Sequence, residues 1–116
     1  MAEPIHVLFV CSANQQRSPT AEAVFADWPG IEVASAGVDN RAYVTLTPEL
    51  LEWANLIFVM EQMHRQKISQ KFKPYLKNQR IICLNIPDEY GYMQPELVEL
   101  LRRRVTHHLP APPPKT

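Results

Sequence analysis

The chain has 116 residues, which is enough for one hydrophobic core and leaves no room for a second domain. Its composition, 46% apolar and 21% charged, is typical of a globular protein, and its formal net charge is zero. The balanced charge and the lack of a long apolar run argue against nucleic acid or a membrane as partner. Two cysteines in a chain without a signal peptide favour a reducing compartment, so we expect a cytoplasmic protein.

Strand and helix patterns alternate along the chain. Four segments are predicted as strands: Ile5–Val10, Glu32–Ser35, Leu56–Met60 and Arg80–Asn85. The predicted helices are Ser18–Trp28, a short helix opened by Thr47-Pro48-Glu49, then Glu61–Phe72 and Gln94–His108. This order predicts an α/β fold, an open four-stranded parallel sheet with helices on both faces. We expect residues 1–109 to form a single domain and the proline-rich residues 110–116 to be a disordered tail.

The loop after the first strand carries the strongest functional pattern. Cys11 ends a buried strand, Arg17 follows six positions later, and Ser18-Pro19 is suited to open a helix, with Ser18 as the N-cap. Loop amides and a helix N-terminus form an anion site, and the same field favours a thiolate over a thiol. The planar guanidinium of Arg17 can hold two oxygens of a phosphoryl group. The pattern therefore predicts a phosphate-binding loop after strand 1, with Cys11 as nucleophile.

The loop backbone is expected to bind the substrate phosphate. In that interpretation, equatorial oxygens are held by Arg17 and by main-chain amides of the loop. The substrate-binding positions are Ser12, Ala13, Asn14, Gln15, Gln16 and Ser18. Another interpretation remains open, in which Cys11 is a buried structural residue and Arg17 a solvated one.

Asp88 is the candidate general acid. It follows the fourth predicted strand, and the carboxyl ends of parallel strands share one edge of a sheet, where ligands bind. A carboxylic acid there can protonate the oxygen that leaves phosphorus. Glu89 is the alternative acid, and Pro87 to Gly91 also has the composition of a plain turn.

The segment around Cys11 resembles the signature of the low-molecular-weight protein tyrosine phosphatases. Val10 and Cys11, Asn14, and the run Arg17-Ser18-Pro19 match the family pattern V-C-x-x-N-x-x-R-S-P. The resemblance continues, with gaps, from about Ile5 to His108, through Ser35-Ala36-Gly37, Met60-Glu61 and Asp88. It implies a cysteine-dependent phosphatase that acts without a cofactor or metal, through a phosphocysteine intermediate, on a phosphorylated protein or a small phosphoester.

The resemblance also implies individual roles. Ser18 corresponds to the hydroxyl that hydrogen-bonds the thiolate, and Asn14 to the residue that fixes the loop shape, braced by Ser35. Asp88 corresponds to the general acid, and Tyr90 to an aromatic residue that flanks the substrate ring.

Two departures from the family pattern bear on specificity. Ala13 and Gln16 replace the usual glycine and second cysteine, so a protective disulfide next to Cys11 cannot form. Only residues 38–46 remain where the family has a longer excursion with an aromatic wall. Tyr43, in that short connection, either lines the pocket or occupies a turn.

Three other functions remain possible at this stage. An arsenate reductase needs a relay of further cysteines, and Cys83 is the only other thiol. A phosphocysteine carrier has no need of Arg17. A non-catalytic phosphate- or phosphoprotein-binding module would keep the loop without turnover.

The four histidines show no metal-ligand spacing, so no metal is expected. The oligomeric state and the physiological substrate are left open.

Overall fold

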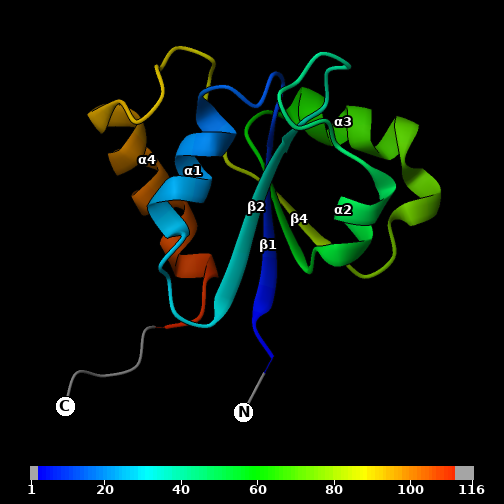
Figure 1. Ribbon diagram of the computed structural model, residues 1–116, viewed down its shortest axis with the longest axis horizontal. Helices are drawn as coiled ribbons and strands as arrows, with labels where there is room; N and C mark the ends of the chain where they lie inside the picture. Colours follow the sequence, from blue (N-terminus) through cyan, green and yellow to red (C-terminus); the bar gives the residue numbers. More distant parts are fainter. Residues whose placement is uncertain (1–2, 112–116) are drawn as a thin grey trace.

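The computed structural model describes residues 3–111 as a parallel sheet between two helical layers (Figure 1). The strands are β1 (Ile5–Cys11), β2 (Ile31–Gly37), β3 (Leu56–Val59) and β4 (Arg80–Cys83), in the order β2-β1-β3-β4. Helices α1 (Arg17–Phe25) and α4 (Pro95–Val105) cover one face of the sheet. The other face is covered by α2 (Pro48–Trp53) and α3 (Gln62–Lys71). The predicted fold class is confirmed.

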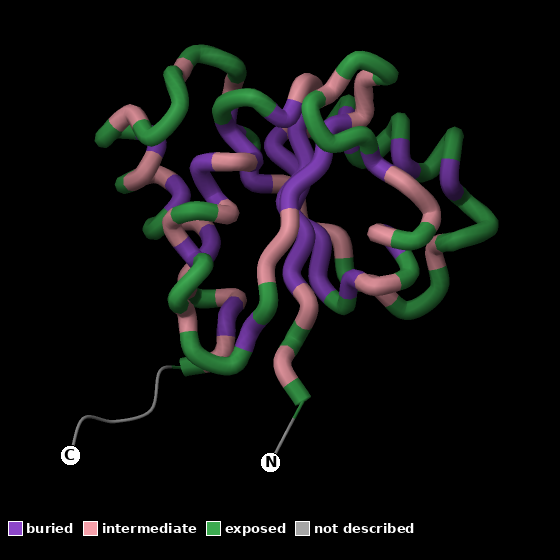
Figure 2. The backbone as a smooth tube through the Cα atoms, in the orientation of Figure 1, coloured by how far each residue is buried: buried purple, intermediate pink, exposed green. Residues whose placement is uncertain are grey.

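From Val7 onward, strand β1 is buried on both faces, as its apolar sequence predicts. Because side chains alternate along a strand, Val7, Phe9 and Cys11 join the core under α1 and α4. Leu8 and Val10 join the second core, under α2 and α3. Figure 2 shows this centre of the molecule as its most buried part. Cys11 therefore sits at the buried end of a central strand.

The loop after β1 lies at the point where the winding of the sheet reverses. The chain leaves β1, adds β2 on one side, and then crosses back to add β3 on the other side. Loops diverge there, which leaves room for a ligand beyond the carboxyl ends of the strands. The same edge receives Glu61 after β3 and Asp88 after β4.

Several predicted boundaries differ from the structure. Helix α1 begins at Arg17, with Gln16 at the N-cap position and no capping side chain, so the prediction that Ser18 is the N-cap is wrong. Ser18 is instead inside the first turn, where its hydroxyl contacts Cys11. The helix predicted to run to His108 ends at Val105 and continues as a 3₁₀ turn, Thr106–His108. Thr47 does cap α2, by accepting a hydrogen bond from the Leu50 amide.

The C-terminal part of the described chain returns to α1. The indole N–H of Trp28 donates to the carbonyl of Pro110 at 2.9 Å. Of the predicted disordered tail, residues 112–116 lie outside the described residues. Between residues 3 and 111, no helix is long and apolar enough to cross a membrane.

Candidate active site

A chain of hydrogen bonds ends on the sulfur of Cys11. The Asn14 side-chain amide donates to the hydroxyls of Ser35 and Ser18, each at 2.9 Å. The Ser35 hydroxyl in turn donates a hydrogen bond to a carboxylate oxygen of Glu22. The Ser18 hydroxyl, which accepts from Asn14, has one proton to give, and the Cys11 sulfur at 2.9 Å is nearer to it than the Ala36 carbonyl at 3.4 Å. Two branches thus leave the Asn14 amide, one ending on the Glu22 carboxylate and the other passing through Ser18 to the Cys11 sulfur. A hydroxyl at this distance can donate to the sulfur when it is a thiolate.

Asn14 adopts an unfavourable backbone conformation in this role. Its backbone has φ 56°, in the left-handed region that asparagine tolerates better than most residues. The side chain is buried, and its oxygen accepts from the Val44 amide at 3.1 Å. All of its amide hydrogens and its carbonyl therefore have partners, and these fix the shape of the loop.

The short connection after β2 clamps the loop from outside. Carbonyls of Cys11, Ser12 and Ala13 accept from the amides of Val38, Asp39 and Tyr43 at 2.9 to 3.1 Å. In a trans peptide the following N–H points the opposite way, so the amides of the loop turn away from this clamp and are available to an anion.

Gly37 allows the close approach between β2 and the loop. A Cβ at this position would lie 2.3 Å from the Ser12 carbonyl oxygen and 2.6 Å from the Ala42 side chain. Backbone and side chain would collide there, so only glycine fits.

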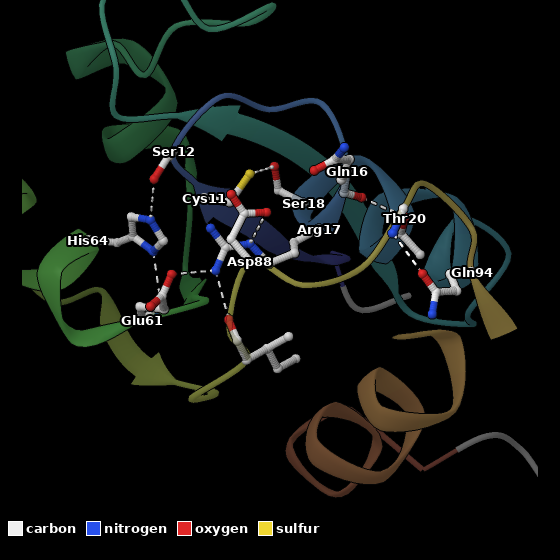
Figure 3. Close-up of polar contacts among 12 residues, drawn as sticks. Cys11, Ser12, Gln16, Arg17, Ser18, Thr20, Glu61, His64, Asp88 and Gln94 are labelled. Atoms are coloured by element: carbon white, nitrogen blue, oxygen red, sulfur yellow. Dashed lines mark hydrogen bonds and ion pairs between the residues drawn. The ribbon is translucent and has the colours of Figure 1, made fainter. Parts of the chain in front are cut away.

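The guanidinium of Arg17 is held in place by two hydrogen-bond acceptors. Its side chain is 2% exposed, and its Nη1 donates to Glu61 Oε1 at 2.6 Å and to the Ile86 carbonyl at 2.7 Å. Its Nε lies 3.8 Å from Asp88 Oδ1 (Figure 3). The anchored nitrogen leaves the Nε edge of the guanidinium facing Asp88, and this is the edge a phosphoryl group would use.

The segment that carries Asp88 is tied to the helix after the loop. The Met93 amide donates to Thr20 Oγ1 at 2.9 Å, and the Thr20 hydroxyl donates to the Gln16 carbonyl. Asp88 itself is 62% exposed, so it borders the site from the solvent side.

A small hollow of about 20 Å³ opens at this place. Its walls are the three predicted catalytic residues and three loop residues: Cys11, Arg17, Asp88, Ala13, Gln15 and Gln16. The structure thus brings together at one hollow three residues separated by up to 77 positions in sequence.

Other predicted site residues lie elsewhere. The Ser12 hydroxyl contacts His64. The side chains of Ser18 and Asn14 hydrogen-bond to each other and support the loop. The amide of Glu89 donates to the Pro87 carbonyl in a turn. Tyr90 packs against the core beside α4, and Tyr43 is 78% exposed. Neither tyrosine lines the hollow, so the aromatic wall expected from the resemblance has no counterpart there.

His64 and Glu61 form a reciprocal capping box at the start of α3. His64 Nδ1 accepts the Glu61 amide at 3.0 Å, while the Glu61 side chain accepts the His64 amide. The imidazole is fully buried. Burial and the Arg17 charge lower the pKa of His64 to about 4, with Lys67 adding to this and Glu61 and Asp39 opposing it. The ring is therefore neutral at physiological pH.

This lowered pKa predicts an acid-labile fold. The unfolded chain takes up a proton near pH 6.5 and the folded chain only near pH 4, so stability is lost as pH falls through this window. The loss attributable to His64 is on the order of 3 kcal/mol. Urea unfolding at pH 7 and pH 4.5 should show a smaller pH-dependent loss for His64→Gln than for the parent. An equal loss in both proteins would contradict the assignment.

The two cysteines cannot form a redox pair. Cys83 is opposite Val59, and Val59 neighbours Val10, so two strand spacings of about 4.8 Å each separate Cys83 from β1. The two side chains also belong to cores on opposite faces of the sheet. A disulfide needs Cα atoms within about 7 Å, so the cysteine relay of an arsenate reductase is not available between them.

Metal ligation has no obvious place in the described chain. Between residues 3 and 111, no three His, Cys, Asp or Glu side chains gather closely enough to hold an ion.

Sequence reasoning missed four contributors to the site. Glu22 accepts from Ser35 at the end of the second hydrogen-bond branch, Glu61 and the Ile86 carbonyl hold Arg17, and His64 contacts Ser12. One signal was present for Glu61, which comes two residues after the buried strand β3, at the edge where the site forms. The histidine gave no comparable signal, because one buried imidazole on a polar helix has no diagnostic pattern.

Comparison with known proteins relates the chain to phosphatases. A family model for low molecular weight phosphotyrosine protein phosphatases matches residues 6–55. The protein-arginine-phosphatase of Bacillus subtilis (strain 168) is 33% identical, with 60% of this chain and 64% of the relative aligned. That of Geobacillus stearothermophilus is 31% identical, over 60% and 63%. The chain thus spans less than two thirds of the length of these curated relatives.

Solved structures share the fold. The YwlE arginine phosphatase from Geobacillus stearothermophilus superposes with a TM-score of 0.70 at 25% identity, covering 86% of this chain and 90% of that one. The tyrosine phosphatase Wzb from Escherichia coli K30, solved with phosphate, gives a TM-score of 0.73 at 21% identity, covering 89% and 94%.

Proposed function

Since the chain belongs to the low-molecular-weight protein tyrosine phosphatase family, we propose that residues 1–109 form one phosphatase domain that hydrolyses phosphate monoesters through a phosphocysteine. The observation that carries this proposal is the shared hollow of Cys11 and Arg17, with the Ser18 hydroxyl directed at the sulfur. An anionic nucleophile and a cationic clamp at one small cavity suit a tetrahedral oxyanion.

The proposed reaction has two steps. The Cys11 thiolate attacks phosphorus and forms an S–P bond while the bond to the leaving oxygen breaks, and Asp88 gives that oxygen its proton. Water then attacks the phosphocysteine, gives a proton to the Asp88 carboxylate, and releases inorganic phosphate with restoration of the thiolate. Arg17 and the loop amides neutralise the equatorial oxygens in both steps. The chemistry requires no cofactor, and its thiolate suits a reducing cytoplasm.

Asp88→Asn should slow hydrolysis most for phosphoesters with poor leaving groups. A phenol of low acidity needs the proton in the transition state, so phenyl phosphate hydrolysis should fall about 100-fold or more. Hydrolysis of p-nitrophenyl phosphate should fall much less, because its leaving group departs as an anion. Glu89→Gln is the matched control and should leave both rates near the parent's. The reverse result would make Glu89 the acid.

A second candidate substrate class is favoured by the lining of the hollow. Gln15, Gln16 and Asp88 supply amides and a carboxylate, and no aromatic ring contributes. Such groups suit a polar, cationic leaving group better than a phenyl ring. The arginine side chain released when the P–N bond of phosphoarginine breaks is such a group, and the curated relatives are named as protein-arginine-phosphatases.

The proposed function is tested by phosphate release from three substrates. These are p-nitrophenyl phosphate, a phosphotyrosyl peptide, and the same peptide with phosphoarginine in place of phosphotyrosine. Release from any of them, lost after alkylation of Cys11, supports the phosphatase. A higher kcat/KM for the phosphoarginyl peptide supports the second candidate. Tight peptide binding without release would instead make the chain a phosphate-binding module.

A further inference from the structure

His64 is the only residue on α3 whose side chain bonds to the phosphate-binding loop in the described chain. Its Nε2 lies 2.9 Å from the hydroxyl oxygen of Ser12, the residue directly after the proposed nucleophile. On its other side, Nδ1 accepts the amide of Glu61, whose carboxylate holds Arg17. Figure 3 shows the imidazole between Ser12 and Glu61.

The hydrogen-bond pattern determines the tautomer. Because Nδ1 accepts an N–H, the proton of the neutral ring must be on Nε2, which donates to Ser12. The neutral ring thus has one acceptor and one donor, both in use. A protonated ring would have two donors, and it would lose its bond to the Glu61 amide and place a second cation near Arg17.

The loop is held differently on its two sides. The connection after β2 clamps it through main-chain bonds from Val38, Asp39 and Tyr43. Toward α3, the contact passes through one side-chain pair, Ser12 and His64. Any shift of this pair would change the separation between the loop amides and the Arg17 guanidinium, which together must enclose one oxyanion.

We propose that His64 is a positioning residue that sets the spacing between the phosphate-binding loop and the Arg17 clamp. Its imidazole acts as a strut, with Ser12 at one end and the Glu61 amide at the other. The proposal rests on the proposed function, since it assigns a use to the same anion site. It makes oxyanion affinity depend on a residue that does not line the hollow.

Two substitutions separate this role from the structural one. His64→Asn keeps an acceptor for the Glu61 amide at the place of Nδ1 but cannot reach Ser12. His64→Gln places an amide donor near the position of Nε2 and loses the cap. If His64 only stabilised the fold, its substitutions would lower oxyanion affinity and folding stability together.

The experiment measures tungstate binding by calorimetry and urea stability for the parent and both variants. His64→Asn should bind tungstate about 10-fold more weakly, the loss expected for one buried hydrogen bond, with only a modest loss of stability because the cap on the Glu61 amide remains. His64→Gln should lose more stability but at most about 3-fold in affinity. Gln62→Ala, an exposed substitution on the same helix turn, is the matched control for both measurements.

A double-mutant cycle completes the test. Ser12→Ala should weaken tungstate binding as much as His64→Asn, and the double variant should be no weaker than either, because both remove the same bond. Additive losses, or parent-like affinity in His64→Asn, would overturn the strut. Failure of the parent to bind tungstate would instead contradict the proposed function, so the two failures are distinguishable.

Discussion

Replacing Cys11 by serine is expected to lower kcat for p-nitrophenyl phosphate by at least about 10⁴-fold, because a serine hydroxyl is a far weaker nucleophile than a thiolate at neutral pH. The effect should appear in kcat more than in KM, since Arg17 and the loop amides that bind the phosphoryl group remain. Phosphate release under saturating substrate is the measurement.

The serine variant should still fold and still bind an oxyanion. Cys11 is buried beside the Ser18 hydroxyl, and a serine oxygen can take the place of the sulfur in that hydrogen bond. Parent-like urea stability and retained tungstate binding are therefore the controls. Parent-like turnover in this variant would rule out a phosphocysteine.

Arg17→Lys is expected to reduce kcat/KM by about 10³-fold, although the charge is conserved. The guanidinium uses one nitrogen to bond Glu61 and the Ile86 carbonyl while another edge faces the hollow. A lysine ammonium is a single point and cannot serve both sides. Steady-state hydrolysis of p-nitrophenyl phosphate, together with tungstate affinity, measures the loss.

The matched control for Arg17→Lys is Arg65→Lys. Arg65 is exposed and donates to the Ile81 carbonyl on another part of the surface, so its replacement should leave turnover unchanged. Near-parent kcat/KM for Arg17→Lys would show that charge alone suffices, and would remove the bidentate clamp from the proposed mechanism.

The short connection after β2 explains how a reduced member of this fold keeps its site. Residues 38–46 supply the backbone donors that hold the loop carbonyls, and Gly37 lets them approach. They leave Tyr43 pointing into solvent. The connection thus holds the loop in place without adding an aromatic wall to the hollow, and under the proposed function the site would recognise the phosphoryl group more than the group that carries it.

The amino-acid sequence by itself determined the α/β fold and the place of the phosphate-binding loop. Both are encoded locally: the apolar run Ile5–Val10 and the short interval from Cys11 to Arg17 are read within a few residues. All four predicted strands overlap strands of the structure, and the pattern is clearest in β3, a continuous apolar segment that is buried throughout.

Only the tertiary structure decided what surrounds that loop. Ser18 matched a helix cap by local rules, but the fold places it beneath the sulfur of Cys11. Glu61 and His64 reach Arg17 and Ser12 across more than 40 positions of sequence. The order of the strands, and the edge at which their loops meet, decide which residues become neighbours. The spacing of residues along the chain does not show which residues meet across a sheet.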